Sequence, residues 1–112
     1  MLPIKDWSKT LRRSLTPTQI VASLAKLEGW RLTGDGTDIA IEKEFTFANY
    51  FHTMAFVNGV ALIAHTQDHH PALEVLFNRC LVKFNTHDVQ GLSANDFECA
   101  ALVDALLKRA DI

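Results

Sequence analysis

The sequence has little cysteine and no excess of charge of one sign. Cys80 and Cys99 are its two cysteines, and neither belongs to a Cys-x-x-Cys pair, which argues against a disulfide framework and a cysteine-rich zinc site. Its 11 lysines and arginines stand against 13 acidic residues, for a net charge of −2. This balance provides no basic field for a phosphate backbone, so we expect no nucleic-acid partner.

Long apolar runs are also absent. Residues 54–64 are apolar except Asn58 and Gly59, but a segment that crosses a bilayer needs roughly 20 residues. No apolar core of about 7 to 15 residues follows the first charged residues, as a secretory signal would require. We therefore expect a reduced, cytoplasmic protein with no membrane partner.

The length sets the scale of the fold. A chain of 112 residues can build one hydrophobic core but not two ordinary domains, so we expect a single domain over residues 1–112. Residues 1–15 have weak periodicity and are predicted to be irregular, with Trp7 and Leu11 packing onto the domain. The basic residues of this segment are expected to be solvated: Lys5, Lys9, Arg12 and Arg13.

The first half of the chain contains signals for a helix and a hairpin. Thr16 begins a capping box and Gly29 follows the last periodic residue, which predicts a helix between them. Two alternating runs follow, at residues 30–33 and 38–45, separated by a Gly-Asp-Gly turn signal. These runs predict a β-hairpin.

Residues 47–64 form the longest periodic segment and predict a second helix. Its apolar residues recur at three- and four-residue steps, and its second half is apolar nearly all round. Such a helix is either covered by its own sheet or buried against another subunit. Because one sheet covers only one face, we favour a homodimer or homotetramer through this helix. Phe56 is then expected to be one of its exposed apolar residues.

The second half of the chain repeats the pattern. Runs at residues 73–77 and 80–84 predict two strands joined by a turn at 78–79. A second capping box, closed by Asp96, precedes a helix over residues 94–109. The order α-β-β-α-β-β-α, with hairpins instead of crossovers, predicts an α+β fold: a four-stranded antiparallel sheet with three helices packed on one face.

Four of the five histidines lie between residues 65 and 96, and three of them are candidates for catalysis. Pro71 cannot continue a helix and biases the residue before it toward extended geometry, so His69 and His70 should lie beyond the second helix. His87 closes the fourth predicted strand. If that strand returns beside the His-His-Pro turn, the three imidazoles converge on one cleft.

Two other chemistries fit these residues less well. A metal site needs ligands that converge on one point, but adjacent histidines in an extended segment point to opposite sides. A nucleophilic site needs an activated serine or cysteine, and both cysteines stand at core-patterned positions where thiols are inert. General acid–base chemistry fits better, since imidazole exchanges a proton near neutral pH. A structural explanation stays open for Asp96, as a helix cap, and for His65, near a helix C-terminus.

The spacing of these residues resembles that of a known family. The His-His-Pro motif at residues 69–71 is followed by Phe77, His87 and Asp96 at the spacing of the pterin-4a-carbinolamine dehydratases. The resemblance extends over residues 15–106. Further positions that match are Gly29-Trp30, Phe45-x-Phe47, Thr86-His87 and Gly91-Leu92-Ser93.

The resemblance implies an α+β fold and the dehydration of 4a-hydroxytetrahydropterin to quinonoid dihydropterin, which recycles the cofactor of aromatic amino-acid hydroxylases. It implies no metal and no cofactor, since the pterin is the substrate. His69 and His70 match the acid–base pair, and His87 the group that holds and polarises the leaving hydroxyl. The candidate substrate-binding residues around them are Asp68, Pro71, Asp88 and Asp96.

One departure from the family pattern concerns a charged pair. Members commonly carry Glu-Lys or a similar pair a few residues before the double histidine, where this chain has His65 and Thr66, with Asp68 as a candidate substitute. Relatives also serve as a transcription-factor dimerisation cofactor or as an assembly factor for a carbon-fixing enzyme. The resemblance therefore implies an alternative function, a noncatalytic protein-interaction module that uses the helical surface.

Overall fold

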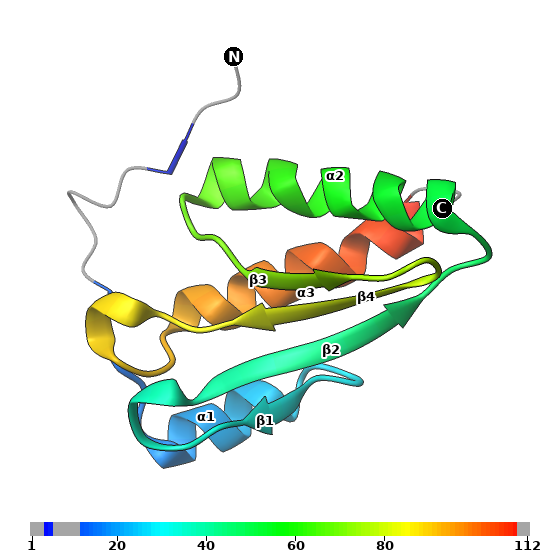
Figure 1. The fold of residues 1–112 in the computed structure, drawn as a ribbon. Helices are drawn as coiled ribbons and strands as arrows, with labels where there is room; N and C mark the ends of the chain where they lie inside the picture. The colour runs from blue at the N-terminus through cyan, green and yellow to red at the C-terminus, as the bar shows by residue number, and fades with distance from the viewer. Residues whose placement is uncertain (1–3, 6–11, 110–112) are drawn as a thin grey trace.

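The computed structural model describes residues 4–5 and 12–109 of the chain. The predicted packing of Trp7 and Leu11 lies outside these residues. Over the described residues the chain forms three α-helices and a four-stranded sheet, whose arrangement can be followed in Figure 1. In chain order the elements are α1 (Pro17–Leu24), β1 (Arg31–Thr33), β2 (Ala40–Thr46), α2 (Tyr50–Gln67), β3 (Ala72–Val75), β4 (Arg79–Phe84) and α3 (Ala94–Arg109), with short 3₁₀ turns η1 (Gly36–Asp38) and η2 (His87–Val89).

The sheet is antiparallel throughout and confirms the predicted α+β fold. Its strand order is β1-β2-β4-β3, so each predicted hairpin contributes one inner and one outer strand. The two inner strands pair with Ile41 opposite Phe84 and Phe45 opposite Cys80. All three helices pack on the face of the sheet to which these four side chains point (Figure 1).

One hydrophobic core joins the sheet to the helices. Alternate residues of β2 and β4 face inward because successive strand side chains point to opposite sides. On the inner strands and on the helices, the buried apolar side chains are Ile20, Ala40, Ile41, Phe45, Phe56, Val60, Ala64, Cys80, Val82, Phe84, Phe97, Cys99, Ala100 and Val103.

The predicted capping box at the start of α1 is present. The Thr16 hydroxyl accepts a hydrogen bond from the backbone N–H of Gln19, and the Gln19 side chain accepts one from the backbone N–H of Thr16. The helix ends at Leu24, earlier than the glycine predicted to stop it. The chain leaves α1 in tighter turns, in which the N–H of Leu27 bonds to the carbonyl of Leu24, so Gly29 follows an already broken helix.

The helix α2 begins at Tyr50, three residues later than predicted, because Asn49 caps it. The Asn49 side chain accepts a hydrogen bond from the N–H of His52. Ahead of the cap, the N–H of Phe47 bonds to the carbonyl of Asn78 in the β3–β4 turn. Within the described residues, no helix is long and apolar enough to cross a membrane.

The expected exposure of Phe56 is wrong. The residues that α2 buries against the sheet and α3 are Thr53, Phe56, Val60 and Ala64. Phe51 is 76 % exposed, and Leu62 is half exposed on the same outward face. Spacing did not identify the buried face, because apolar residues occur on all sides of this helix.

The turn between β3 and β4 lies one residue earlier than predicted. The N–H of Leu76 bonds to the carbonyl of Arg79, which makes Phe77 and Asn78 the two loop residues. The hydroxyl of Thr53 in α2 donates to the carbonyl of Phe77 and holds this turn against the helix. The turn contains no glycine, so the sequence offered no strong signal for its register.

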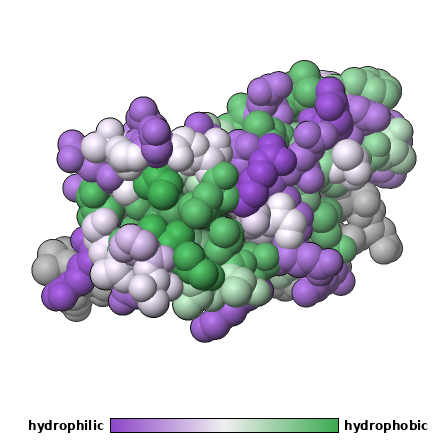
Figure 2. Space-filling view, turned by 90° about the horizontal axis from the view of Figure 1, so that it is seen from below, coloured by the Kyte–Doolittle hydropathy of each residue, from purple (hydrophilic) through white to green (hydrophobic). Residues whose placement is uncertain are grey.

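Large apolar side chains of α1 and β1 are exposed at two positions. Figure 2 views the molecule from the side of α1 and β1 and shows an apolar patch on this face. On these two elements the exposed large apolar side chains are Val21 and Leu32. Single exposed apolar residues are common on protein surfaces, so this patch alone does not indicate a binding site.

Candidate active site

The segment that carries the double histidine begins where α2 ends. Asp68 adopts a left-handed conformation, with φ of 49°, and the N–H of His69 returns to the carbonyl of Ala64. This is the usual way in which a helix is closed, although it more often uses glycine. The next two side chains then point to opposite sides: His69 is only 6 % exposed, whereas His70 is exposed to solvent.

A buried hydrogen-bond network fixes His69. Its Nε2 donates to Oδ1 of Asp96 over 2.6 Å, and its ring stacks on Phe84 at a centroid distance of 5.8 Å. The other carboxylate oxygen of Asp96 accepts from the Thr86 hydroxyl at 2.7 Å and from the backbone N–H of Ser93 at 2.9 Å. Asp96 is fully buried, and these bonds compensate the cost of removing its charge from water.

Asp96 therefore has the predicted structural role at the start of α3. Its bond from the Ser93 N–H is the reverse half of a capping box. The Ser93 hydroxyl does not complete the box, because it is hydrogen-bonded to the Thr86 hydroxyl instead. Asp96 lines neither of the two clefts described below, and it contacts the site through His69.

His87 stands on a closed loop after β4. The N–H of Thr86 bonds to the carbonyl of Gly91 at 2.9 Å, and the N–H of Gly91 returns to the carbonyl of Thr86 at 3.3 Å. The 3₁₀ turn η2 lies inside this closure, and Gln90 adopts a left-handed conformation that brings the chain back. His87 is exposed at the start of the turn.

The segments of His70 and His87 border two adjoining clefts, and the buried His69 borders only one of them. One cleft, of about 210 Å³, is lined by Arg12, Asp68, His69, His70, Asn85, Thr86, His87 and Asp88. The other, of about 550 Å³, is lined by Gly34, Asp38, His70, Pro71, Ala72, Lys83, Asn85 and His87. His70, Asn85 and His87 line both, so the two clefts adjoin at the end of the sheet.

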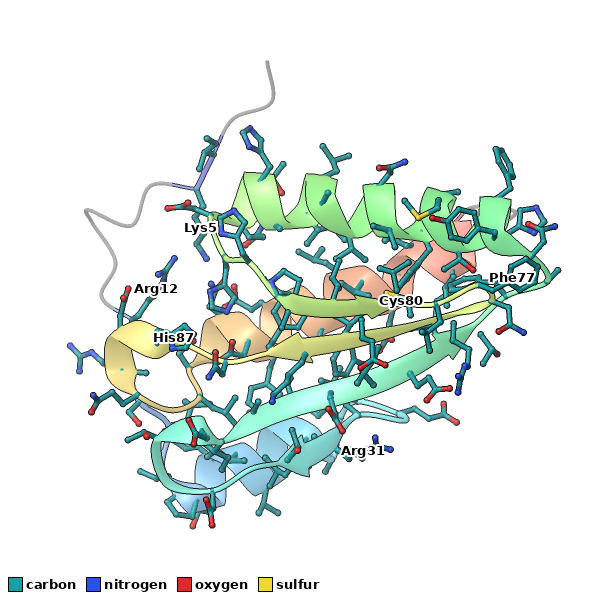
Figure 3. All side chains as sticks on the ribbon, viewed as in Figure 1. Lys5, Arg12, Arg31, Phe77, Cys80 and His87 are labelled. Carbon is teal, nitrogen blue, oxygen red and sulfur yellow. The ribbon has the colours of Figure 1, made fainter. Side chains whose placement is uncertain are left out.

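Arg12 joins this site from the N-terminal segment, where it was expected to be solvated. Its guanidinium donates to the backbone carbonyl of Asp68 at 2.6 Å and to the carboxylate of Asp88 at 3.0 Å. Figure 3 shows Arg12 and His87 at the same end of the sheet. No sequence signal distinguished Arg12 from its basic neighbours, and none pointed to Asn85 or Lys83.

The alternative chemistries have little support in the geometry. Burial raises the pKa of the Cys80 thiol to about 11 and that of Cys99 to about 12, where the Asp96 carboxylate adds to the effect. Both thiols are inaccessible, unlike those of reactive cysteines. Across residues 4–5 and 12–109, no three His, Cys, Asp or Glu side chains group as ligands of one metal ion.

Comparison with known proteins identifies the family to which this arrangement belongs. A model of the family described as pterin 4 alpha carbinolamine dehydratase matches residues 13–106. The chain is a member of this family. The matched residues include the three candidate histidines and Asp96, and exclude Arg12.

Relatives of high identity support this assignment. A protein of Paracidovorax citrulli, provisionally named a pterin-4-alpha-carbinolamine dehydratase, is 58 % identical over 99 % of this chain and 96 % of its own length. A protein of the same provisional name from Bdellovibrio bacteriovorus is 52 % identical over 92 % of this chain and 86 % of its own. The similarity seen in the histidine motif thus extends over most of the length of these two relatives.

Solved structures confirm the fold. The crystal structure of a transcriptional coactivator/pterin dehydratase from Brucella melitensis matches with a TM-score of 0.77 and 29 % identity, covering 83 % of this chain and 97 % of that one. A pterin dehydratase-like protein identified as a RuBisCO assembly factor in the alpha-carboxysome matches with a TM-score of 0.63 over 74 % and 94 % of the two chains. At 24 % identity, the second likeness shows the fold alone.

Proposed function

We propose that this protein catalyses the dehydration of 4a-hydroxytetrahydropterin to quinonoid dihydropterin by histidine general acid–base catalysis. In this reaction the bond between C4a and its hydroxyl breaks, and the oxygen leaves as water after accepting a proton. A proton is removed from the neighbouring ring nitrogen, whose electron pair forms the new double bond to C4a. The reaction therefore needs one group that gives a proton and one that takes a proton.

The observation that carries the proposal is the placement of two exposed imidazoles on the wall of one cleft. His70 and His87 both line the two adjoining clefts, and imidazole can act as either acid or base near neutral pH. Membership of the dehydratase family supports the substrate class. The carboxylates of Asp68 and Asp88 line the smaller cleft, where they can accept hydrogen bonds from the N–H groups of a pterin.

The geometry favours a division of roles among the three histidines. The Nε2 of His69 is already bonded to Asp96 inside the protein, so His69 is suited to hold the wall of the site. His70 and His87, exposed to the clefts, are better placed to exchange protons with a substrate. The alternative pairing, with His69 and His70 as acid and base, stays a prediction. Single substitutions of the three histidines distinguish it from the pairing of His70 with His87.

The test is the turnover of freshly generated 4a-hydroxytetrahydropterin, corrected for the spontaneous reaction. His70→Ala and His87→Ala are each expected to lower kcat by roughly 10²-fold or more, because each removes a proton-transfer group. His52→Ala is the matched control, since His52 lies at the other end of α2. A wild-type rate no faster than buffer would disprove the dehydratase proposal.

A second candidate function rests on the outward face of α2. Phe51 and Leu62 are large apolar residues exposed on that face, and they belong to a helix that is apolar nearly all round, as a helix buried against another subunit is. We propose that this face forms a homodimer or homotetramer contact. If the site proves inactive, the same face would serve a noncatalytic interaction module, as the named roles of the coactivator and assembly-factor structures suggest.

The two candidates differ in which variant abolishes function. The enzyme loses turnover with His70→Ala while its oligomeric state is unchanged. The module tolerates His70→Ala but loses partner binding with Leu62→Glu. A link to an aromatic amino-acid hydroxylase follows only from the first candidate, and coupled assays of the two enzymes would test it.

A further inference from the structure

Two chain segments build the histidine site, and each brings one exposed imidazole. His70 belongs to the segment that leaves α2, and His87 belongs to the loop that leaves β4. The catalytic use of both requires a fixed spacing between them, because general acid–base catalysis depends on hydrogen-bond reach to one substrate. What holds the two segments together is therefore part of the site.

On the buried side, the segments are joined through Asp96. Its carboxylate accepts from His69, next to His70, and from Thr86, next to His87. This connection orients the backbone beneath each exposed imidazole. It does not reach the outer rim of the cleft, where the side chains of His70 and His87 lie.

On the exposed side, Arg12 spans the same two segments. One guanidinium nitrogen donates to the carbonyl of Asp68, which precedes the double histidine. The other donates to the carboxylate of Asp88, which directly follows His87. The bond to Asp68 is 2.6 Å long and falls on the residue whose left-handed conformation closes α2.

We propose that Arg12 is a positioning residue that clamps the His70 segment to the His87 loop and sets the spacing of the two imidazoles. The inference rests on the proposed function for its catalytic readout, whereas its structural readout is independent. Arg12 stands one residue before the stretch that matches the family model, residues 13–106.

The burial of Arg12 distinguishes this clamp from an ordinary surface ion pair. An exposed ion pair contributes little to stability, and Asp88 by itself would form such a pair, with a side chain that is 72 % exposed. The Arg12 side chain is only 16 % exposed, and its second partner is a main-chain carbonyl. The segment behind it is also fixed, since the N–H of Leu15 bonds to the carbonyl of Leu92 at 2.8 Å.

The geometry requires arginine. A guanidinium presents several N–H groups in a rigid plane and can bond two acceptors on different segments at once. A lysine at this position would keep the charge and the pairing with Asp88, but a single ammonium on a flexible stem does not reproduce the planar fork. Arg12→Lys therefore removes the planar fork of the clamp while it keeps the positive charge.

The first test compares Arg12→Lys, Arg12→Ala and Arg13→Ala in the dehydratase assay. Both changes at Arg12 are expected to lower kcat roughly 10- to 100-fold with a smaller effect on KM, because the imidazoles lose their spacing. Arg13 lines neither cleft. Arg13→Ala removes the same charge one residue away and should leave turnover unchanged. Millimolar guanidinium ion should restore part of the activity of Arg12→Ala and none of that of Arg12→Lys.

The second test needs no activity. In heteronuclear NMR spectra, Arg12→Lys should shift the ring signals of both His70 and His87 while leaving those of His52 unchanged and the melting temperature close to that of the wild type. If the wild type proves inactive, the dehydratase proposal fails, and these ring signals alone decide the clamp. Ring signals and turnover of Arg12→Lys that equal those of the wild type would overturn it. If Arg12→Ala fails to fold, Arg12→Lys carries both tests.

Discussion

Asp96 is the residue on which two parts of the molecule depend. Its carboxylate caps the start of α3 and at the same time binds the side chains of His69 and Thr86. The sequence presented these as alternatives, a structural cap or a site residue. One buried carboxylate with two oxygens serves the cap and the histidine network at once, because each oxygen accepts from a different direction.

The loss of this carboxylate should destabilise the fold. Asp96→Ala leaves His69, the Thr86 hydroxyl and the Ser93 N–H without their acceptor in the core, and is expected to cost about 3–5 kcal/mol. Asp96→Asn keeps one acceptor oxygen and should cost less. Urea denaturation measures both, with Asp35→Ala, on an exposed loop, as a control expected within about 0.5 kcal/mol of the wild type. Equal stability of Asp96→Ala and the wild type would contradict the network.

The two thiols give a prediction at high pH. In the unfolded chain they ionise near their ordinary pKa of 9.0, whereas in the folded protein the pKa values are raised to about 11 for Cys80 and about 12 for Cys99. Above pH 9 the unfolded state therefore binds fewer protons than the folded state, and stability falls as pH rises toward 11. The contribution is fully present below pH 9.

A double Cys80→Ala/Cys99→Ala variant should lack this part of the pH dependence. Denaturation series across the alkaline range measure the difference in slope between variant and wild type. Near neutral pH, a thiol reagent should label neither cysteine in the folded protein and both after denaturation, since both side chains are buried. Rapid labelling of the native protein would show that the core is open at these positions.

At the scale of elements, the sequence predicts which helices and strands exist, and in what order, better than it predicts which face of a helix is buried and where each element ends. The capping signals have a physical basis in a few adjacent residues, and α1 and α3 begin where they stand, with a full box at Thr16 and half of one at Ser93. The phase of α2 was not predictable, because a helix with apolar residues all round buries whichever face the sheet selects. The Arg12 contact was not predictable either, because its two partners are distant in sequence and carry no motif.

The two faces of α2 should respond differently to charge. Phe51→Glu and Leu62→Glu place a charge on the outward face, and we expect them to shift the protein to a smaller assembly without unfolding it. Sedimentation equilibrium measures the mass. Val21→Glu on α1 makes the same substitution on another exposed surface and should change nothing. Outward variants that keep the wild-type assembly would exclude this face as the interface.

Phe56→Glu is the complementary change on the buried face. Phe56 is fully buried and packs its ring against Phe45 and Phe47, at centroid distances of 4.7 and 5.0 Å. A charge there has no partner among these rings, so the expected result is unfolding and no new oligomer. Circular dichroism distinguishes an unfolded variant from a folded one.

At the scale of the whole molecule, the strand order divides the sheet into a protected centre and two weak edges. The inner strands β2 and β4 pair along six positions, whereas β1 contributes three residues and every residue of β3 is exposed. Local stability should follow this order, because strands with fewer buried contacts open more easily.

Hydrogen exchange should therefore be slowest for amides of β2 and β4 and faster in β1 and β3. Exchange measured by NMR at several protein concentrations checks this order residue by residue. The β3 amides that point away from β4 are expected to exchange fastest, as edges do when nothing pairs with them. Slow exchange there, rising with dilution, would show that another strand covers this edge.

Because β2 pairs with β4, the centre of the sheet cannot fold during synthesis until β4 has been made. Ile41 leaves the ribosome early but must wait for Phe84, and Asp96 follows later still. By that time α2 has been made and has no finished sheet to pack on, so the growing chain exposes both of its apolar faces. Nascent chains in this condition are those that chaperones bind. The histidine site cannot form until residue 96 has been made, because it joins Arg12 to Asp88 and His69 to Asp96.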